Sequence, residues 1–488
     1  MKKFLTYLGL ILIILACMSI IRTFFWTTET VAPVPVDSAQ TVAIDEQAAA
    51  KNLAHALRFK TISEQDTAQI DYAEFDSLHA FLRRTFPRVH ARLSLQKFGK
   101  SLLFTWKAPN SALKPFALLA HQDVVPVIPG TEQDWQHPPF AGIISDGYIH
   151  GRGALDDKAS MMALLEAAEY LLGQGFTPER TLYFIFGQDE EIGGARGAAR
   201  IARYFQEQGI EFDMVLDEGG AIAEGLMPGI DTPIALVGIA EKGYLSIELT
   251  VRAPGGHSSV PPKHTAIGIL SRAITRLEDS PFPANLRYST EMMRGLGDKA
   301  PFLQRLLFAN QWLFAPLLKK VMSSKPSASA SIRTTTAVTM ASAGVKENVL
   351  PIEATAVVNF RILPGETRES VVARVRRIID DPQVEIRRLG GSDPSPVSRT
   401  DSPAFALLKN TIRASVPLPD LAIAPYLVMA GTDAKHFSSL SENVYRFIPF
   451  HILQQDMKSI HGTNERIEVE NYAQVIGFYI RLFRDAGQ

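Results

Sequence analysis

Three polar groups between positions 121 and 191 each follow a short apolar run that predicts a β-strand. They lie at 121–123, 151–158 and 189–191, and together they contain histidine, aspartate and glutamate. Because the carboxyl ends of strands in an open α/β sheet carry its site, we expect all three groups to meet at one edge. Nitrogen and carboxylate ligands of this kind can build a metal centre without cysteine.

Composition limits the partners of the chain. Its 488 residues include 46% apolar and 21% charged residues, which predicts an ordinary globular body of two or three domains. The formal net charge is -1 and no block of lysine and arginine appears, so nucleic acid is excluded as an expected partner. Cys17 is the only cysteine and lies in the apolar N-terminal segment, so any metal must be held by His, Asp or Glu.

The first 26 residues have the composition of a membrane element. Lys2 and Lys3 precede an uncharged stretch, 4–21, which Arg22 follows. Eighteen helical residues span about 27 Å, enough for a hydrocarbon core. We expect an uncleaved anchor; the alternatives are a cleaved signal peptide or a lipid attached at Cys17. The two lysines then place the body outside the cytoplasm, in a periplasm, a lumen or the extracellular space.

The polar, proline-containing stretch 27–46 is typical of a linker. Beyond it, alternating strand and helix patterns predict an α/β fold, a mixed sheet with helices on both faces. The expected strands are 102–106, 116–120, 182–187 and 212–216, and the expected helices are 158–172 and 194–208. We assign 47–240 and 391–488 to this catalytic domain.

The pattern changes near Glu241. Strands at 244–253, 334–343, 354–363 and 384–389, with helices at 265–278 and 368–379, give the order β-α-β-β-α-β. This order predicts a small ferredoxin-like α+β domain, 241–390, inserted into the first domain. An additional apolar insertion, 280–331, is expected to be helical.

The candidate site residues have structural alternatives. His121 ends a strand, and Asp123, two residues on, could hold its other imidazole nitrogen; the alternative is a histidine in a polar loop. Asp156 and its neighbour Asp157 follow a tight turn, where an aspartate could also cap the next helix. Of Glu190 and Glu191, one can bind metal and the other accept a proton from the attacking water, unless both are simply solvated.

Two further positions stay open on the residues alone. The pair Asp217-Glu218 again ends an apolar strand and offers a carboxylate at the same edge. One histidine from the C-terminal part is also needed, and spacing does not choose among His436, His451 and His461.

Five motifs in order resemble the signatures of the M20 family of co-catalytic zinc metallopeptidases, from about residue 47 to the C-terminus. They are HQD at 121–123, GRGALDDK at 151–158, DEEIGG at 189–194, GGHSS at 255–259 and IHGTNE at 460–465. Within the family, the N-terminal segment and the long insertion are most similar to the branch of carboxypeptidase S and the secreted N-acyl-amino-acid hydrolase/synthases.

The resemblance implies two Zn²⁺ per subunit, with Co²⁺ or Mn²⁺ also suited to these ligands. It assigns one zinc to His121, Asp156 and Asp217 and the other to Asp156, Glu191 and His461. Asp217 is chosen over Glu218 because it aligns with the acid directly after the strand. Glu190 would be the general base, and Asp123 would orient His121.

The resemblance also implies a homodimer through the inserted domain, which would act as a lid. His257 would reach the site of the partner subunit and stabilise the oxyanion. Asn348, Arg361 and the loop containing Gly431 and Thr432 would hold the carboxylate of the substrate.

Three functions are compared. The first is a carboxypeptidase or dipeptidase acting on small peptides with a free C-terminus. The second is an aminoacylase-like enzyme that cleaves or forms N-acyl amino acids, which the apolar insertion and the nearby membrane favour. The third is an inactive, membrane-anchored binding protein, which retention of every ligand type and of Glu190 disfavours. A serine hydrolase is disfavoured because the sequence lacks a G-x-S-x-G elbow.

Overall fold

A ten-stranded sheet forms the centre of the protein. Its strands are β1 (Ser94–Phe98), β2 (Ser101–Trp106), β3 (Phe116–His121), β6 (Leu182–Gly187), β7 (Met214–Asp217), β8 (Ile222–Ala223), β9 (Ile234–Glu241), β16 (Ala422–Val428), β17 (Val444–Arg446) and β18 (His451–Ile452). They lie in the order β1-β2-β6-β3-β7-β17-β9-β8-β18, with β16 paired to β9. β6, β3, β7 and β17 are parallel neighbours, whereas β1, β2 and β6 pair antiparallel. The predicted mixed sheet is thus confirmed.

The computed structural model describes residues 2–26, 44–109, 112–225, 229–230, 232–418, 420–453 and 456–487. The predicted linker 27–46 therefore lies outside the described residues, apart from 44–46. The strands expected at 102–106, 116–120 and 182–187 match β2, β3 and β6 to within one residue at each end.

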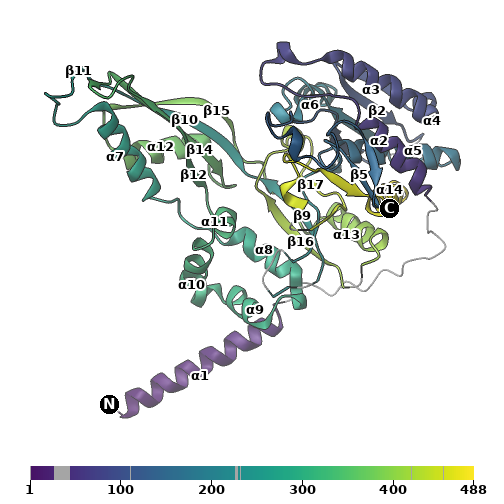
Figure 1. Ribbon diagram of the computed structural model, residues 1–488. Coiled ribbons are helices and arrows are strands. Elements are labelled where there is room, and N and C mark those ends of the chain that lie inside the picture. Colours follow the sequence, from purple (N-terminus) through teal and green to yellow (C-terminus); the bar gives the residue numbers. More distant parts are fainter. Residues whose placement is uncertain are drawn as a thin grey trace.

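Helices cover both faces of this sheet, as predicted (Figure 1). On β3, Phe116 and Leu118 pack into one core, whereas Ala117 and Leu119 pack into the other. This alternation follows from the two-residue period of a strand buried on both faces. The first core contains α2 (Glu46–Ala56), α3 (Tyr72–Thr85), α4 (Pro87–Arg92), α5 (Lys158–Gly173), α13 (Pro403–Ser415) and α14 (Val469–Asp485), and the second contains α6 (Ala198–Glu207).

A second, four-stranded antiparallel sheet follows directly after β9. Its strands are β10 (Gly243–Arg252), β12 (Thr335–Ala343), β14 (Glu353–Ile362) and β15 (Val384–Ser392), in the order β12-β14-β10-β15. Two helices, α7 (Ala266–Glu278) and α12 (Arg368–Ile379), share an apolar core with it. The β-α-β-β-α-β order expected from the sequence is present.

Two short sheets complete the strands. At the far tip of the small sheet, β11 (Gly256–His257) pairs with β13 (Val349–Leu350). In the other, β4 (Ile143–Ser145), β5 (Tyr148–His150) and β19 (Arg466–Glu468) lie side by side. This sheet joins the C-terminal segment to the residues that precede the turn at 151–158.

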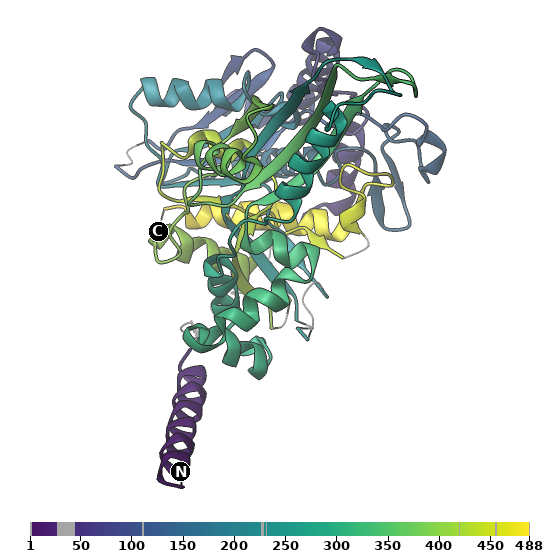
Figure 2. The ribbon, with the colours of Figure 1, turned by 90° about the vertical axis from the view of Figure 1, so that its left-hand side faces the viewer.

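Four helices fill the apolar insertion: α8 (Arg287–Leu296), α9 (Phe302–Ala309), α10 (Gln311–Ser323) and α11 (Pro326–Ile332). The sequence assigned them to the inserted domain, yet α8 packs on the large sheet. Met293 and Leu296 share a core with Ala422 and Ala424 of β16. Both views place these helices between the body and the N-terminal helix (Figures 1 and 2).

The N-terminal helix α1 (Lys2–Phe24) projects away from the body (Figure 2). The part Lys3–Phe24 is long and apolar enough to cross a membrane by length and composition, and nearly all of it is exposed. A signal sequence would have the same properties.

Candidate metal centre

The carboxyl ends of β3, β6 and β7 bring the first candidate side chains together. These strands are parallel neighbours, so His121 at the end of β3 faces the loop that follows β6 and the residues that end β7. The loop after β6 enters a short 3-10 helix, η4 (Glu190–Ile192). Strand direction therefore gathers groups that are about 70 to 100 positions apart, which is the usual way an α/β sheet builds a site.

His121 is buried, and each of its ring nitrogens has a distinct environment. Nδ1 lies 2.9 Å from the backbone oxygen of Asp123 and 3.5 Å from its carboxylate. Nε2 lies 2.8 Å from Asp156 Oδ1 and 3.4 Å from Glu218 Oε1. A hydrogen bond from Nδ1 to the carbonyl fixes the tautomer that leaves the Nε2 lone pair facing the carboxylates.

Asp123 fastens the acidic loop to the end of β3. Its carboxylate accepts hydrogen bonds from the backbone nitrogens of Glu190, at 3.2 Å, and Glu191, at 3.1 Å, and from the Ser63 hydroxyl. The sequence assigned Asp123 to orienting His121. In the structure, the backbone carbonyl of Asp123 is nearer to the imidazole than its carboxylate is. The carboxylate instead holds the backbone of Glu190 and Glu191 in place.

Asp156 lies between two groups of donors. Its Oδ1 faces His121, and its Oδ2 lies 3.0 Å from His461 Nε2, which in turn lies 3.1 Å from Glu191 Oε2. In each group the donor atoms lie within 4.8 Å of one another. The groups are His121, Asp156 and Glu218, and Asp156, Glu191 and His461.

Glu218, and not Asp217, belongs to the first group of donor atoms, whereas the resemblance favoured Asp217 as the ligand. Asp217 Oδ2 accepts a hydrogen bond from the backbone nitrogen of Ala434 at 2.6 Å, and its Oδ1 accepts one from Glu218 nitrogen at 2.9 Å. Successive side chains of a strand point to opposite sides. Asp217 therefore turns into the protein, while Glu218 faces His121.

The charges of this cluster fit divalent cations. Burial, followed by the nearby charge of Asp156, raises the pKa of Glu218 to about 8. Burial also raises the pKa of Glu191, whose Oε1 has no hydrogen-bond partner among the described residues. Hydrogen bonds to Asp156 and Glu191 raise the pKa of His461 to about 10. Crowded carboxylates and two imidazoles form a nitrogen and oxygen donor set that suits zinc, cobalt or manganese.

Glu190 points into the same pocket and belongs to neither donor group. Burial raises its pKa well above the usual range, and the charge of Glu218 raises it further. Glu190 and Glu191 are neighbours on η4 yet differ in surroundings, because Glu191 belongs to a donor group and Glu190 does not.

A buried ion pair that the sequence did not single out holds the turn carrying Asp156. Glu465 accepts a hydrogen bond from Arg152 Nη1 at 2.6 Å and further bonds from the backbone nitrogens of Gly153, Leu155 and Asp156. Glu465 lies four positions after His461. One carboxylate therefore fixes the position of Asp156 relative to the segment that supplies His461.

Asp433 is a second buried acid without an assigned role. Neither of its oxygens has a hydrogen-bond partner among the described residues, and burial raises its pKa well above the usual range. A Cβ added at Gly187 or Gly194 would collide with its carboxylate, so a larger residue at either position would displace this buried side chain. Asp433 follows Thr432 in the predicted carboxylate-binding loop, but no local signal marks it as buried.

The donor groups open into a pocket of about 1100 Å³. Of the predicted substrate-binding residues, Arg361, Gly431 and Thr432 line it. Arg361 stacks its guanidinium over the Tyr244 ring at 5.0 Å, and Lys435 adds a second cation to the pocket wall. The remaining wall is largely apolar and includes Ala223, Leu236, Phe450, Ile452, Met457 and Ile460.

His257 and Asn348 lie outside this pocket. His257 is exposed on β11, at the tip of the small sheet and distant from the donor groups (Figure 1). Asn348 lies beside it, and its backbone oxygen accepts a hydrogen bond from Ser258 nitrogen at 3.2 Å. The two residues are therefore neighbours, but within one chain they do not reach the site.

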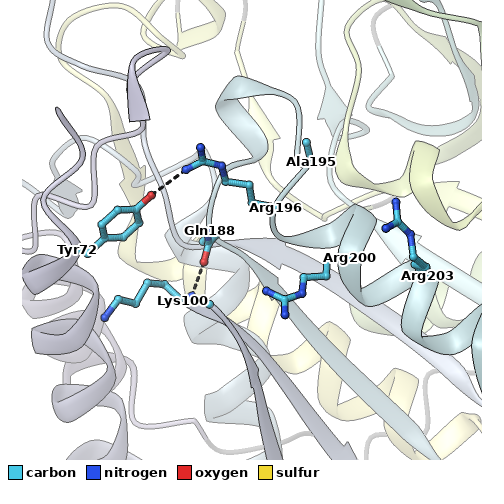
Figure 3. Close-up of a pocket in the computed structure, with 8 residues that line it drawn as sticks. Tyr72, Lys100, Gln188, Ala195, Arg196, Arg200 and Arg203 are labelled. Carbon is cyan, nitrogen blue, oxygen red and sulfur yellow. Dashed lines mark hydrogen bonds between the residues drawn. The ribbon is translucent and has the colours of Figure 1, made fainter. Parts of the chain in front are cut away.

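A separate hollow of about 650 Å³ is lined in part by Gln188 (Figure 3). Lys100, Arg196, Arg200 and Arg203 line it, and Arg196 donates a hydrogen bond to the Tyr72 hydroxyl at 3.2 Å. Among the described residues that line this hollow there is no carboxylate or imidazole. The groups capable of metal binding and proton transfer are in the larger pocket.

Comparison with known proteins gives a family match over most of the chain. The model of peptidase family M20/M25/M40 matches residues 117–485. "Probable carboxypeptidase S-like 2" of Dictyostelium discoideum is 42% identical over 463 residues, covering 94% of this chain and 88% of the relative. "N-fatty-acyl-amino acid synthase/hydrolase PM20D1" of Xenopus tropicalis is 40% identical over 441 residues, covering 88% and 84%.

Solved structures share the fold. The M20 family metallo-carboxypeptidase Sso-CP2 from Sulfolobus solfataricus superposes with a TM-score of 0.63 at 18% identity, covering 91% of this chain and 99% of that one. The overall arrangement of sheets and helices is thus the one found in that structure.

Proposed function

The chain belongs to peptidase family M20/M25/M40, a family of metallohydrolases, and on this premise we propose that it cleaves the amide bond of small peptides or N-acyl amino acids with a free carboxylate. The observation that carries the proposal is the position of Asp156 between His121 and His461, with Glu190 in the same pocket. Two donor groups that share a carboxylate suit a pair of Zn²⁺ ions.

The ligands would be His121, Asp156 and Glu218 for one ion and Asp156, Glu191 and His461 for the other. When bound, such ions supply Lewis acidity to the scissile carbonyl and lower the pKa of the attacking water. The residues of the chain then move the protons. Glu190 accepts a proton from the water as the water oxygen attacks the carbonyl carbon. It then delivers that proton to the leaving nitrogen as the C–N bond breaks.

The carboxylate of the substrate would be held by the cationic side of the pocket. Arg361 presents a planar guanidinium that can bind a carboxylate through two hydrogen bonds. The loop at Gly431 and Thr432 is fixed from behind, because Glu241 accepts hydrogen bonds from both the nitrogen and the hydroxyl of Thr432, at 2.8 and 2.9 Å. A fixed loop in the same pocket as Arg361 favours substrates with one free carboxylate.

The apolar wall favours a second, more specific candidate, an N-fatty-acyl-amino-acid hydrolase or synthase. Leu236, Phe450, Ile452 and Met457 offer an acyl chain a surface with few hydrogen-bonding groups. A peptide would leave its backbone amides unpaired there, which costs about 1–3 kcal/mol for each group. Relatives that carry this activity in their names support the same candidate.

We also propose that the chain acts as a homodimer and remains anchored by α1, with its body outside the cytoplasm. His257 would then come from the partner subunit, because its own site is too distant. Lys2 and Lys3 before the apolar span support this orientation.

A substrate panel tests the proposal. Purified full-length protein is assayed with a dipeptide series and with N-acyl amino acids of increasing chain length. We expect chelator-sensitive hydrolysis, with kcat/KM rising along the acyl series. Removal of the free carboxylate by amidation should abolish it. Equal rates for free and amidated substrates would exclude the carboxylate pocket, and activity unaffected by a chelator would exclude the metal centre.

A further inference from the structure

The helical insertion carries an apolar surface that faces solvent. Leu313, Leu317 and Val321 lie at i, i+4 and i+8 on α10 and are all exposed, Val321 by 54%. Phe302 and Leu303 on α9 are also exposed, Leu303 by 65%. Side chains at this spacing form one stripe along a helix. We name the exposed apolar side chains of α9 and α10, which include Trp312 of α10, the insertion face.

The charged residues in the sequence that carries this face are all basic. From Lys299 to Arg333 the chain contains no aspartate or glutamate, although the whole protein has 51. The cations in this stretch are Lys299, which pairs with Asp420, and Arg305, Lys319, Lys320, Lys325 and Arg333. Apolar stripes flanked by lysine and arginine are typical of helices that lie in the interface of a bilayer with anionic headgroups.

A buried polar contact joins this face to α1. Asn310, between α9 and α10, donates hydrogen bonds to Ser19 oxygen at 3.0 Å and to the Thr23 hydroxyl at 3.2 Å. Asn310, Ser19 and Thr23 are all buried. The Phe24 ring lies 5.9 Å from that of Phe302. The insertion face therefore begins where the last turns of α1 end (Figures 1 and 2).

The depth of this junction in a bilayer determines which part of the bilayer the insertion face contacts. If α1 spans a bilayer, Ser19 and Thr23 lie near one end of the apolar span, beside Arg22. The helices attached there are then held at the height of the headgroups. Apolar and cationic side chains are both satisfied at that level, because the rings and aliphatic chains enter the acyl boundary while the ammonium groups remain among the headgroups.

We propose that the insertion face is a second membrane-contacting surface, which lies on a bilayer with anionic headgroups and fixes the orientation of the catalytic body. The proposal rests on the anchoring role proposed for α1. The body would follow the insertion rigidly, because Met293 and Leu296 of α8 are packed against Ala422 and Ala424 of β16. Leu236, which lines the substrate pocket, packs against the same core.

The test uses full-length protein in nanodiscs that contain phosphatidylcholine and phosphatidylglycerol. Cys17→Ser removes the only cysteine, and nitroxide labels are placed singly through Leu317→Cys on the insertion face, Ile352→Cys in the small domain and Ile13→Cys in α1. Ile352 is 69% exposed and serves as the matched control. Power-saturation electron paramagnetic resonance reports the access of oxygen and of a water-soluble nickel complex.

We expect position 317 to lose access to nickel and gain access to oxygen relative to position 352, and position 13 to be shielded from nickel as well. Replacing all anionic lipid by phosphatidylcholine should raise nickel access at 317 and leave 13 unchanged. If this exchange has no effect at 317, the assignment of anionic headgroups is overturned.

Three other results would overturn the proposal. Nickel access at 317 equal to that at 352, with 13 shielded, would show that the face lies in water. Exposure of 13 would remove the anchor on which the proposal depends. Spin-spin broadening at 317 that disappears on dilution with unlabelled chain would show that a second copy covers the face. Turnover measured in the same nanodiscs reports the hydrolase activity independently of all three results.

Discussion

Arg152 donates a hydrogen bond to Glu465 at 2.6 Å, and both side chains are fully buried. The two residues are 313 positions apart. Their contact joins the turn that carries Asp156 to the segment that carries His461, and so it determines whether the two donor groups can share one carboxylate. The geometry of the candidate metal centre thus depends on an ion pair that contains no candidate ligand.

Glu465→Gln should destabilise the protein and loosen metal binding. Breaking a buried ion pair leaves the Arg152 charge without compensation, which costs on the order of 3–5 kcal/mol. The shift of the Asp156 turn should weaken metal affinity by about 10- to 100-fold. Thermal unfolding and metal titration measure the two effects. Glu468→Gln, on the exposed end of β19, is the control and should change neither; a Glu465→Gln protein that behaved like it would contradict this role.

The variants Glu218→Ala and Asp217→Asn should show which of these two acids binds metal and which only supports the site. Loss of the Glu218 carboxylate removes one donor of the first group, so we expect about one metal ion per chain in place of two, with turnover reduced at least about 100-fold. Asp217→Asn keeps one oxygen that can accept the hydrogen bond from Ala434 and loses the acceptor of the bond from Glu218 nitrogen, so it should lower stability yet retain both ions. Metal analysis of the two purified variants decides between them, and the reverse pattern would restore Asp217 as the ligand.

Protonation of His79 should lower the free energy of unfolding as the pH falls. Burial lowers the pKa of this histidine to about 4; its Nε2 lies 2.7 Å from Gln122 Oε1, and Lys97 lies 3.3 Å from its Nδ1. Since the unfolded chain binds the proton near pH 6.5 and the folded chain only near 4, stability is complete above pH 6.5. It decreases by up to about 3 kcal/mol as the pH falls through this window.

Urea unfolding at several pH values measures this effect. His79→Gln should unfold with a shallower dependence on pH between about 6.5 and 4, because its amide does not titrate in that window. His264→Gln, on an exposed segment, should keep the dependence of the unmodified protein. Identical slopes for His79→Gln and the unmodified protein would refute the assignment to His79.

Mixed subunits should test whether His257 acts across a dimer. His257→Ala and Glu190→Gln chains are each expected to lose most turnover, the first by removing oxyanion stabilisation, worth about 100- to 1000-fold. In a mixed dimer, one site would combine an intact Glu190 with His257 of the other chain. Activity should therefore reappear after unfolding and refolding the two variants together. No recovery, despite mixed dimers detected by differential tags, would argue against exchange.

The sequence predicted the strands β2, β3 and β6 and the gathering of His121, Asp156 and the acidic loop at one edge. The strands follow from local periodicity, and the meeting of His121 with the acidic loop follows from the rule that parallel strands end together. Asp156 reaches this edge differently, because the strand before it, β5, lies in a separate antiparallel sheet with β4 and β19. The choice between Asp217 and Glu218 required the actual end of β7, because a shift of one residue reverses the side to which a side chain points. Glu465 carried no local signal of burial. The docking of α8 on β16 could not be predicted either, because an amphipathic pattern shows that one face of a helix is buried but not which element covers it.

The metal content and turnover of Glu190→Gln, measured beside those of the unmodified chain, test the central claim most directly. The substitution removes the proposed base and leaves every proposed ligand in place. We predict about two zinc ions per chain in both proteins, with kcat reduced about 100- to 10,000-fold in the variant and KM little changed. A variant that binds two ions and retains kcat within tenfold would contradict the role of Glu190. An unmodified chain that is fully active without metal would contradict the metal centre itself.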